Sequence, residues 1–179
     1  MPNRYNMALM RSLNEEYESK KIISTFIDYD DEYQLQLADR RITALANQIN
    51  FTDKRILEIG CGGGYVSYQL AKKYGCSVIG IDIYDSPVWE RLTHSSLQYH
   101  NMDLSQDCQF LNDEFDVVIS YVAWEHMKHP FNALKQTARI LKASGVIYIA
   151  ANLYRSAISS HLYRQIFSHF LIFYLKMRL

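Results

Sequence analysis

An acid followed by three alternate glycines is the segment of this sequence most suited to chemistry. Glu58-Ile-Gly-Cys-Gly-Gly-Gly64 holds four of the chain's seven glycines within five residues. Glycine lets the backbone turn sharply and come within contact distance of a ligand. The segment stands between an apolar run and a helical pattern, and ligands bind at such turns at the carboxyl ends of parallel strands. We therefore predict a ligand-binding loop here, with a turn that only permits tight packing as the alternative.

The residue types in this loop discriminate between ligands. A dinucleotide-binding loop has the pattern Gly-x-Gly-x-x-Gly, which lets a pyrophosphate reach the N-terminus of the helix. Here the sixth position of that pattern is Tyr65. The carboxylate of Glu58 would also repel a phosphate, and it suits a cationic group such as an ammonium. The loop argues against NAD, so a nicotinamide-dependent oxidoreductase is the less favoured enzyme class.

Two further acids follow predicted strands. Asp82 ends the second apolar run, where a carboxylate can accept hydrogen bonds from both hydroxyls of a ribose. Asp103 follows the third run and could accept a hydrogen bond from the exocyclic amine of an adenine. For each of them, a solvated aspartate at a strand end is the alternative.

Alternating apolar runs and helical patterns must position these residues. We predict strands at 55–59, 77–81, 97–100, 115–120 and 145–150, and helices at 65–74, 87–93 and 132–143. This alternation implies crossover connections and an α/β fold whose doubly wound, mainly parallel sheet has about five strands. Residues 1–50 are predicted to be helical, and they either close over an acceptor as a lid or pad the sheet.

The ordered set of motifs resembles the class I S-adenosylmethionine-dependent methyltransferases, of the type that acts on small molecules. The resemblance covers roughly residues 53–151 and rests on Glu58-x-Gly-x-Gly-x-Gly64, Asp82, Asn101-Met-Asp103, Phe115-Asp-Val-Val-Ile-Ser120 followed by Trp124-Glu-His-Met, and Leu141-Lys-Ala-Ser-Gly145 as the turn before the fifth strand. It implies a Rossmann-like methyltransferase fold in three parts. These are an N-terminal helical lid or cap (1–50), an S-adenosylmethionine-binding core (51–151) and a helical C-terminal segment (152–179).

The resemblance also implies that S-adenosylmethionine is the cofactor. The backbone of the glycine loop would contact its methionine part, and Asp82 would hold the ribose. Met102 and Asp103 would border the adenine, and Ser120 with Tyr121 would line the amino acid end. The expected cofactor-binding residues are Glu58, Gly60, Cys61, Gly62, Gly64, Asp82, Ile83, Met102, Asp103, Ser120 and Tyr121.

Candidates for the chemistry itself lie after the fourth and fifth strands. A sulfonium methyl is already activated, so the protein mainly aligns the reactants and excludes water. His126 is the candidate base for a hydroxyl acceptor, with a helix-cap or packing histidine as the alternative. Tyr154 and Arg155 are candidate substrate contacts, because Arg155 can fork onto a carboxylate or phosphate. A solvated arginine is the other interpretation.

Two other chemistries are not favoured. Glu125-His126-x-x-His129 differs from the His-Glu-x-x-His order of zinc proteases, and Pro130 begins or ends a helix there. Cys61 has no base beside it in the sequence that would make it a nucleophile. We therefore expect neither a metal site nor covalent catalysis by cysteine.

Composition narrows the partners and the compartment. Lysine plus arginine equals aspartate plus glutamate at 19 each, so no basic excess attracts nucleic acid or an anionic membrane. Three cysteines and a start without an apolar signal core favour a cytoplasmic location. The longest apolar stretch, 166–175, is shorter than the ~20 residues that cross a bilayer, so we expect no membrane span.

The C-terminal segment is expected to depart from the resembled fold, which continues with a helix and an antiparallel hairpin. This tail lacks hairpin turn residues, so we expect a helix or a truncated end. The fifth strand would then keep an exposed edge that invites a homodimer, and activity would be impaired. The leading interpretation is methyl transfer to a small-molecule acceptor, with a hydroxyl slightly favoured. The alternative is a non-catalytic or truncated S-adenosylmethionine-binding protein of the same fold.

Overall fold

The computed structural model describes residues 30–106, 108–151 and 172–175. The chain divides into two compact units, Met1–Tyr33 and Gln34–Leu179. Within the described part of the first unit, the amide of Glu32 donates a hydrogen bond to Oδ1 of Asp30 at 3.1 Å. The sheet and the candidate site lie in the second unit.

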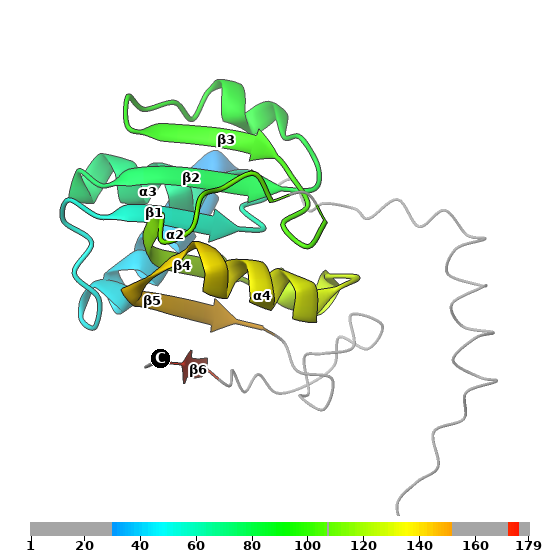
Figure 1. The fold of residues 1–179 in the computed structure, drawn as a ribbon. Coiled ribbons are helices and arrows are strands. Elements are labelled where there is room, and N and C mark those ends of the chain that lie inside the picture. Colours follow the sequence, from blue (N-terminus) through cyan, green and yellow to red (C-terminus); the bar gives the residue numbers. More distant parts are fainter. Residues whose placement is uncertain (1–29, 107, 152–171, 176–179) are drawn as a thin grey trace, which may run out of the picture. The chain divides into compact units, whose positions relative to one another are not determined.

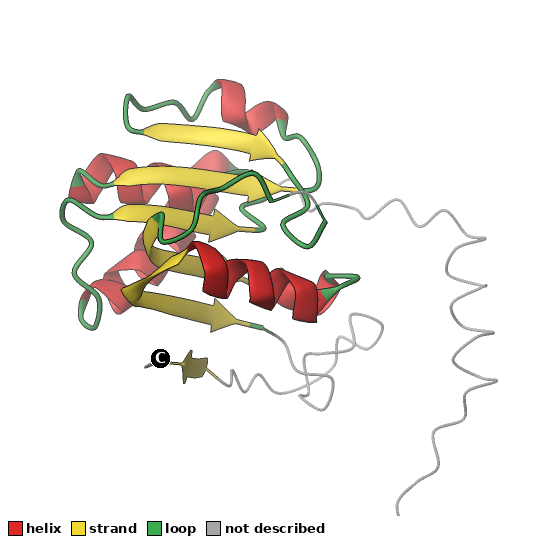
Figure 2. Cartoon of the chain, in the orientation of Figure 1, coloured by secondary structure: helices red, strands yellow, loops and turns green. Residues whose placement is uncertain are grey.

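A sheet forms the centre of the second unit, with six strands among the described residues (Figures 1 and 2). Their order is β3-β2-β1-β4-β5-β6; β1 to β5 pair in parallel and β6 pairs antiparallel to β5. The strands are β1 (Arg55–Ile59), β2 (Ser77–Asp82), β3 (Leu97–Asn101), β4 (Phe115–Tyr121), β5 (Leu141–Ala150) and β6 (Ile172–Leu175). The doubly wound, mainly parallel α/β sheet predicted from the sequence is confirmed.

Helices cover both faces of this sheet (Figure 1). Buried residues of α2 (Asp31–Ala46) and α3 (Tyr65–Tyr74) pack with one set of strand side chains, and Ile140 of α4 (Pro130–Ile140) packs with the other. Two short 3₁₀ helices, η1 (Pro87–Glu90) and η2 (Trp124–His126), follow β2 and β4. Helix α3 ends where the sequence predicts, because Gly75 takes the left-handed conformation of a C-terminal cap, with φ 63°.

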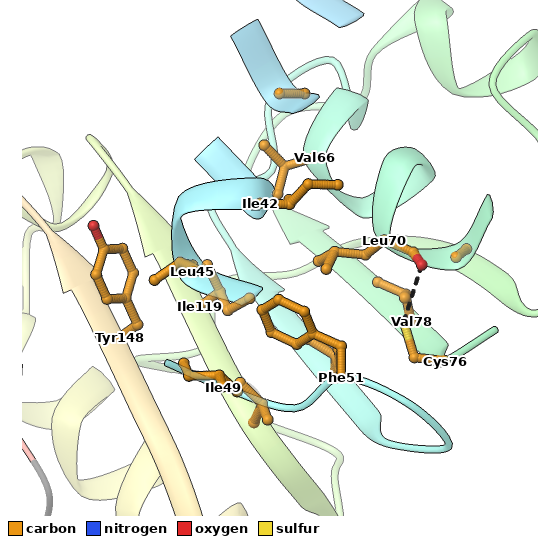
Figure 3. Close-up of a cluster of buried hydrophobic side chains, with 14 residues drawn as sticks. Ile42, Leu45, Ile49, Phe51, Val66, Leu70, Cys76, Val78, Ile119 and Tyr148 are labelled. Atoms are coloured by element: carbon orange, nitrogen blue, oxygen red, sulfur yellow. Dashed lines mark hydrogen bonds between the residues drawn. The ribbon is translucent and has the colours of Figure 1, made fainter. Parts of the chain in front are cut away.

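The buried cluster on the α2 and α3 face shows why the strands are almost continuously apolar. Ile42 of α2, Leu70 of α3 and Ile119 of β4 are fully buried in the same cluster (Figure 3). Leu57 and Ile59 of β1 point to the opposite face and join the second cluster with Ile140. Because successive side chains of a strand alternate between faces, a strand covered on both faces is apolar throughout.

The region between α4 and β5 differs from the prediction. The helix expected at 132–143 begins at Pro130, which suits the first helical turn because proline lacks an amide hydrogen. It ends at Ile140, and β5 begins at once with Leu141, which is buried and opposite Phe115. Phe115 pairs with Leu141 and Val117 pairs with Val146, so an advance of two residues along β4 corresponds to five along β5. The segment expected as a turn before the fifth strand is therefore an irregular part of the strand itself.

The C-terminal prediction also needs correction. Residues 172–175 form β6 where a helix was expected, and they pair with β5 from Ile147 to Ala150. The second side of β5 is thus covered over these residues, which removes the exposed edge on which the expected homodimer was based. The rest of the segment 152–179 and residues 1–29 of the predicted N-terminal lid lie outside the described residues.

Candidate functional site

The strand order places the candidate residues at one edge of the sheet. The order reverses between β1 and β4, because β1 leads outward to β2 and β3 while β4 leads outward to β5. In open parallel sheets, ligands bind at the carboxyl ends of the strands beside such a reversal. Glu58 is the second-last residue of β1 and the glycine loop follows that strand, Asp82 ends β2, and Ser120 and Tyr121 end β4. The structure thus brings together residues that are distant in the sequence.

The glycine loop needs glycine for conformation and for space. Gly60, Gly62 and Gly64 have φ values of 73°, 52° and 80°, a region that side chains rarely adopt. A Cβ on Gly60 would lie 2.1 Å from the Cβ of Ala123, the second residue after β4. A Cβ on Gly62 would meet nothing within 4 Å. Gly60 therefore permits close packing across the strand reversal, and Gly62 faces open space that a ligand can enter.

Asp82 is oriented by the loop it faces. The amide of Gly62 donates to Oδ2 of Asp82 at 2.8 Å, and the amide of Tyr84 donates to Oδ1 at 3.2 Å. A carboxylate offers about four lone-pair sites, so both oxygens keep acceptor capacity for hydroxyls. The next residue, Ile83, is 54% exposed and lies beside this acid. A sugar ring with neighbouring hydroxyls fits Asp82, and an apolar base attached to that ring fits Ile83.

Glu58 is a buried acid. It is 3% exposed, and the hydroxyl of Ser67 donates to its Oε2 at 2.5 Å. Burial raises the pKa of Glu58 to about 7, against the lowering effects of the Ser67 hydrogen bonds and of the positive charge of Arg41. A carboxylate that is costly to ionise in isolation is stabilised by a cation. Glu58 is therefore suited to an ammonium group, as the sequence suggests.

The contacts of Arg41 and Tyr148 with Tyr121, a predicted cofactor-binding residue, escaped prediction. The guanidinium of Arg41, on α2, lies 4.9 Å from the ring centroid of Tyr121. The Tyr121 hydroxyl donates to the carbonyl of Arg41 at 3.3 Å, and its ring lies 5.3 Å from that of Tyr148. Burial, with the nearby charge of Glu58 among the smaller causes, raises the pKa of Tyr121. Nothing in the local sequence separates Arg41 from its neighbour Arg40, so this contact depends on the tertiary fold.

The residues after β3 have local partners. The amide of Met102 donates to the carbonyl of Asp82 at 2.8 Å, which holds this segment beside β2. The carboxylate of Asp103 accepts the amide and hydroxyl of Ser105 and the side-chain amide of Gln106. Partial burial raises the pKa of Asp103, but these hydrogen bonds outweigh it, so the pKa lies below its ordinary value. Its contact with an adenine amine stays a prediction.

The end of β4 holds a buried polar group, and the residue that follows the strand is strained. Within the described residues, Ser120 is fully buried and its Oγ has no hydrogen-bond partner. Val122 has φ 53°, a strained conformation for a β-branched residue and one that is found near functional sites. His126 is exposed in η2, with its amide on the carbonyl of Ala123. Tyr154 and Arg155 lie outside the described residues.

The two remaining loop residues that the sequence assigns to the site are both buried. Cys61 is buried, and burial raises the pKa of its thiol, which does not suit a nucleophile. Gly64 is also buried, and a Cβ there would lie 2.4 Å from the ring of Tyr99. No group of three or more histidine, cysteine or acidic side chains could hold a metal in the described part of the chain. Among the same residues, no helix is long and apolar enough to cross a membrane.

The polar groups of the site fit S-adenosylmethionine, the cofactor that the sequence suggests. Gly62 leaves room for a ligand, and the carboxylates of Asp82 and Glu58 supply hydrogen-bond acceptors. The buried hydroxyl of Ser120 is available to hydrogen-bond that ligand. This arrangement at the reversal of a doubly wound α/β sheet is suited to a nucleoside that carries a cationic group, as S-adenosylmethionine does.

The match to a known family agrees with this assignment of the cofactor. The family model described as "Methyltransferase domain" matches residues 57–149, which is 93 of 179 residues. The chain belongs to this family, and the expected membership of the class I S-adenosylmethionine-dependent methyltransferases is confirmed. S-adenosylmethionine is accordingly the cofactor of this domain class.

Curated relatives share the domain. The ubiquinone biosynthesis O-methyltransferase of Aeromonas salmonicida is 33% identical over 102 residues, which cover 54% of this chain and 42% of that protein. Its counterpart from Pseudomonas fluorescens (strain SBW25) is 26% identical over 115 residues, covering 62% of this chain and 49% of that protein. The chain thus spans about half the length of the curated relatives it matches.

Solved structures share the fold. A chain from the complex between the Haloferax volcanii Trm112 methyltransferase activator and a putative methyltransferase is 28% identical, with a TM-score of 0.59. The match covers 73% of this chain and 61% of that chain. A phosphoethanolamine N-methyltransferase of Haemonchus contortus, solved with S-adenosylhomocysteine, is 25% identical with a TM-score of 0.58. It covers 63% of this chain and 28% of that chain.

Proposed function

We propose that this chain binds S-adenosylmethionine at the carboxyl ends of β1, β2 and β4 and transfers its methyl group to a small-molecule acceptor. One observation carries the proposal. The carboxylate of Asp82 is held by the amide of Gly62, and Gly62 is the one glycine of the loop 60–64 on which a Cβ would meet no atom within 4 Å. An oriented acid next to open space is what a ribose needs.

The charges at the site suit the two ends of an amino acid. Glu58 would take the ammonium, because a cation offsets the free energy that burial adds to its ionised form. Arg41 would take the carboxylate, because its guanidinium lies over Tyr121 at the end of β4, close enough to Glu58 to lower the pKa of that acid. Ile83 would pack against the adenine with its exposed side chain.

The chemistry supplied when S-adenosylmethionine is bound is a methyl group already activated by the sulfonium. The protein aligns the acceptor for in-line attack and excludes water. A hydroxyl is the favoured acceptor, since the curated relatives above are named O-methyltransferases. His126 would remove its proton, because it is exposed and lies just after β4, beside the strand reversal.

Composition supports the setting of this activity. The free cysteines Cys61, Cys76 and Cys108 fit a reducing cytoplasm. Balanced charge favours a small acceptor over nucleic acid. Residues 1–50 would act as the lid or cap of the acceptor site.

Calorimetric titration with S-adenosylmethionine tests the proposal, using Asp82→Ala and Gly62→Ala with Gly75→Ala as the matched control. Gly62 and Gly75 have φ values of 52° and 63°, and a Cβ on either meets nothing within 4 Å. An alanine therefore adds the same backbone strain at both positions, about 1 kcal/mol. We expect micromolar binding by the wild-type chain and Gly75→Ala, and loss of binding in the other two variants.

A folded wild-type chain that binds no S-adenosylmethionine would refute the proposal. Equal binding by Gly62→Ala and Gly75→Ala would show that the loop is not the site. Methyl transfer to a panel of phenols, alcohols and amines then separates an enzyme from the non-catalytic alternative. In that assay, His126→Gln should slow transfer to hydroxyls by about 100-fold and leave cofactor binding unchanged.

A further inference from the structure

Two aromatic side chains from separate elements lie stacked beside the glycine loop. Trp89 of η1 and Tyr99 of β3 have ring centroids 5.1 Å apart and planes inclined by 7°. A Cβ on Gly64 would lie 2.4 Å from the Tyr99 ring, so the pair is in contact with the loop. We call Trp89 and Tyr99 the aromatic brace.

Each member of the brace donates a hydrogen bond to the loop backbone. The indole Nε1 of Trp89 donates to the carbonyl of Gly62 at 2.8 Å, and the hydroxyl of Tyr99 donates to the carbonyl of Gly64 at 3.0 Å. The two carbonyls differ in a useful way. That of Gly64 also accepts the amide of Tyr68 at 2.9 Å, so it keeps a backbone partner if the Tyr99 hydroxyl is removed.

Gly62 is consequently held from both sides. Its amide donates to Asp82, and its carbonyl accepts from Trp89. Glycine is the most flexible residue, and a left-handed glycine beside open space has little else to define its orientation. Since the amide of Gly62 orients the Asp82 carboxylate, a donor that fixes the Gly62 carbonyl also fixes that acid.

Trp89 is itself well placed for this task. Ser86 caps η1 by accepting the amide of Val88 at 3.3 Å, and Pro87 restricts the first turn. The amide of Trp89 donates to the carbonyl of Ser86 at 3.1 Å. The tryptophan therefore projects from a short, capped turn that the sequence defines locally, and stacking on Tyr99 limits its rotation.

We infer that Trp89 is a positioning residue for the cofactor, acting through the Gly62 peptide and the Asp82 carboxylate. The inference rests on the proposed function, since it concerns the affinity of the same site. A fixed Gly62 peptide binds with a smaller loss of backbone entropy than a free one. The indole N–H should thus tighten binding of the cofactor rather than stabilise the fold as a whole.

Trp89→Phe and Tyr99→Phe form a matched pair for the test. Each keeps an aromatic ring for the stack and removes one donor to a loop carbonyl. We expect Trp89→Phe to weaken S-adenosylhomocysteine binding by about 3- to 10-fold, the effect of one hydrogen bond. Tyr99→Phe should change the affinity by less than about 2-fold, because the Gly64 carbonyl keeps its Tyr68 partner. The melting temperatures of the two ligand-free variants should agree.

A spectroscopic signature separates positioning from packing. The chain has two tryptophans, so a nitrogen–proton correlation spectrum shows two indole signals, and that of Trp89 is missing in Trp89→Phe. In the wild type this signal should exchange slowly with solvent and shift on titration with S-adenosylhomocysteine. Equal affinity of the wild type and Trp89→Phe, an equal loss in Tyr99→Phe, or an indole signal that does not respond would each overturn the inference. A wild-type chain that binds no S-adenosylhomocysteine would overturn the proposed function as well.

Discussion

Acidic residues have different partners at the amino and the carboxyl ends of β1, β4 and their neighbouring strands. At the amino ends, the guanidinium of Arg55 pairs with Glu114 at 2.5 Å, and Lys142 pairs with Asp116 at 2.9 Å. At the carboxyl ends, Glu58 accepts from the hydroxyl of Ser67. Asp82 beside it accepts from backbone amides. The acids at the amino edge of the sheet form ion pairs with basic side chains. Those at the carboxyl edge accept hydrogen bonds from neutral donors, and Arg41 acts on Glu58 only as a nearby charge.

The difference separates a stabilising edge from a binding edge. Burial raises the pKa of Asp116, but the amide of Arg55 and the contacts of Lys142 outweigh it, so the pKa lies below its ordinary value. Burial instead raises the pKa of Glu58 to about 7. A negative charge held by neutral donors is stabilised when a cation binds, so the carboxyl edge is suited to the positively charged ligand proposed above.

The largest effect is expected from Gly60→Ala at the binding edge. Gly60 and Gly75 have φ values of 73° and 63°, but a Cβ on Gly60 would lie 2.1 Å from that of Ala123, whereas one on Gly75 meets no atom within 4 Å. We expect Gly75→Ala to lose about 1 kcal/mol of unfolding free energy and to bind S-adenosylhomocysteine normally. Gly60→Ala should lose about 1–3 kcal/mol more and bind about 100-fold more weakly.

Urea unfolding and calorimetry measure both quantities. Equal stabilities of Gly60→Ala and Gly75→Ala would mean that the loop yields at Ala123 without loss. Unchanged affinity in Gly60→Ala would show that the approach of β1 to the segment after β4 does not shape the site.

An intermediate effect with opposite signs is expected from Glu58→Gln and Glu114→Gln. Because the pKa of Glu58 is raised in the folded state, the folded chain binds more protons than the unfolded chain between about pH 4.5 and pH 7. The contribution of Glu58 to stability therefore falls as pH rises through that window. At pH 8, Glu58→Gln should leave the ligand-free chain as stable as the wild type or more stable, since a glutamine oxygen can still accept from Ser67. Glu114→Gln removes a partner of Arg55 and should be destabilising.

The affinity for S-adenosylhomocysteine should rank Glu58→Gln and Glu114→Gln in the opposite order to their stability. We expect Glu58→Gln to weaken S-adenosylhomocysteine binding by about 10- to 100-fold at pH 8, because a charged hydrogen bond to the ammonium is lost. The affinity of the wild type should rise with pH towards a plateau above pH 7, whereas that of Glu58→Gln stays level. A destabilised Glu58→Gln, or a wild-type affinity independent of pH, would break the contrast between the two edges.

Local patterns predicted the elements whose ends are defined by nearby residues. The first strand stops at the glycine loop, and α3 stops where predicted, before Gly75, which has a left-handed conformation. The fifth strand was predicted too short, because Leu141 to Gly145 continues a helical pattern with residues that pair irregularly with β4. β6 was missed because its pairing with β5 is antiparallel and non-local, and no tight turn in the sequence indicates it.

The site shows the same division. The glycines and the acids are recognisable because each lies at the end of its own strand or just after it. Trp89 and Tyr99 reach the loop across 27 and 35 residues, and the Arg41 carbonyl meets Tyr121 across 80. Aromatic and basic residues in these patterns are common throughout the chain. Only the three-dimensional fold shows which of them touch the loop.

The smallest effect is expected at the stabilising edge, from Lys142→Ala. The side chains of Lys142 and Asp116 are 40% and 21% exposed, and a pair open to solvent contributes about 1 kcal/mol or less. Because the pKa of Asp116 is lowered in the folded state, the pair stabilises the chain above the unfolded pKa, and this is lost as pH falls through the folded pKa. Lys142→Ala should therefore be slightly less stable at pH 7 and equal to the wild type once Asp116 is protonated. Urea unfolding across this range, with calorimetric titration of S-adenosylhomocysteine at pH 7, checks both edges at once. A loss above about 2 kcal/mol, or a change in affinity, would show that the amino edge also serves binding.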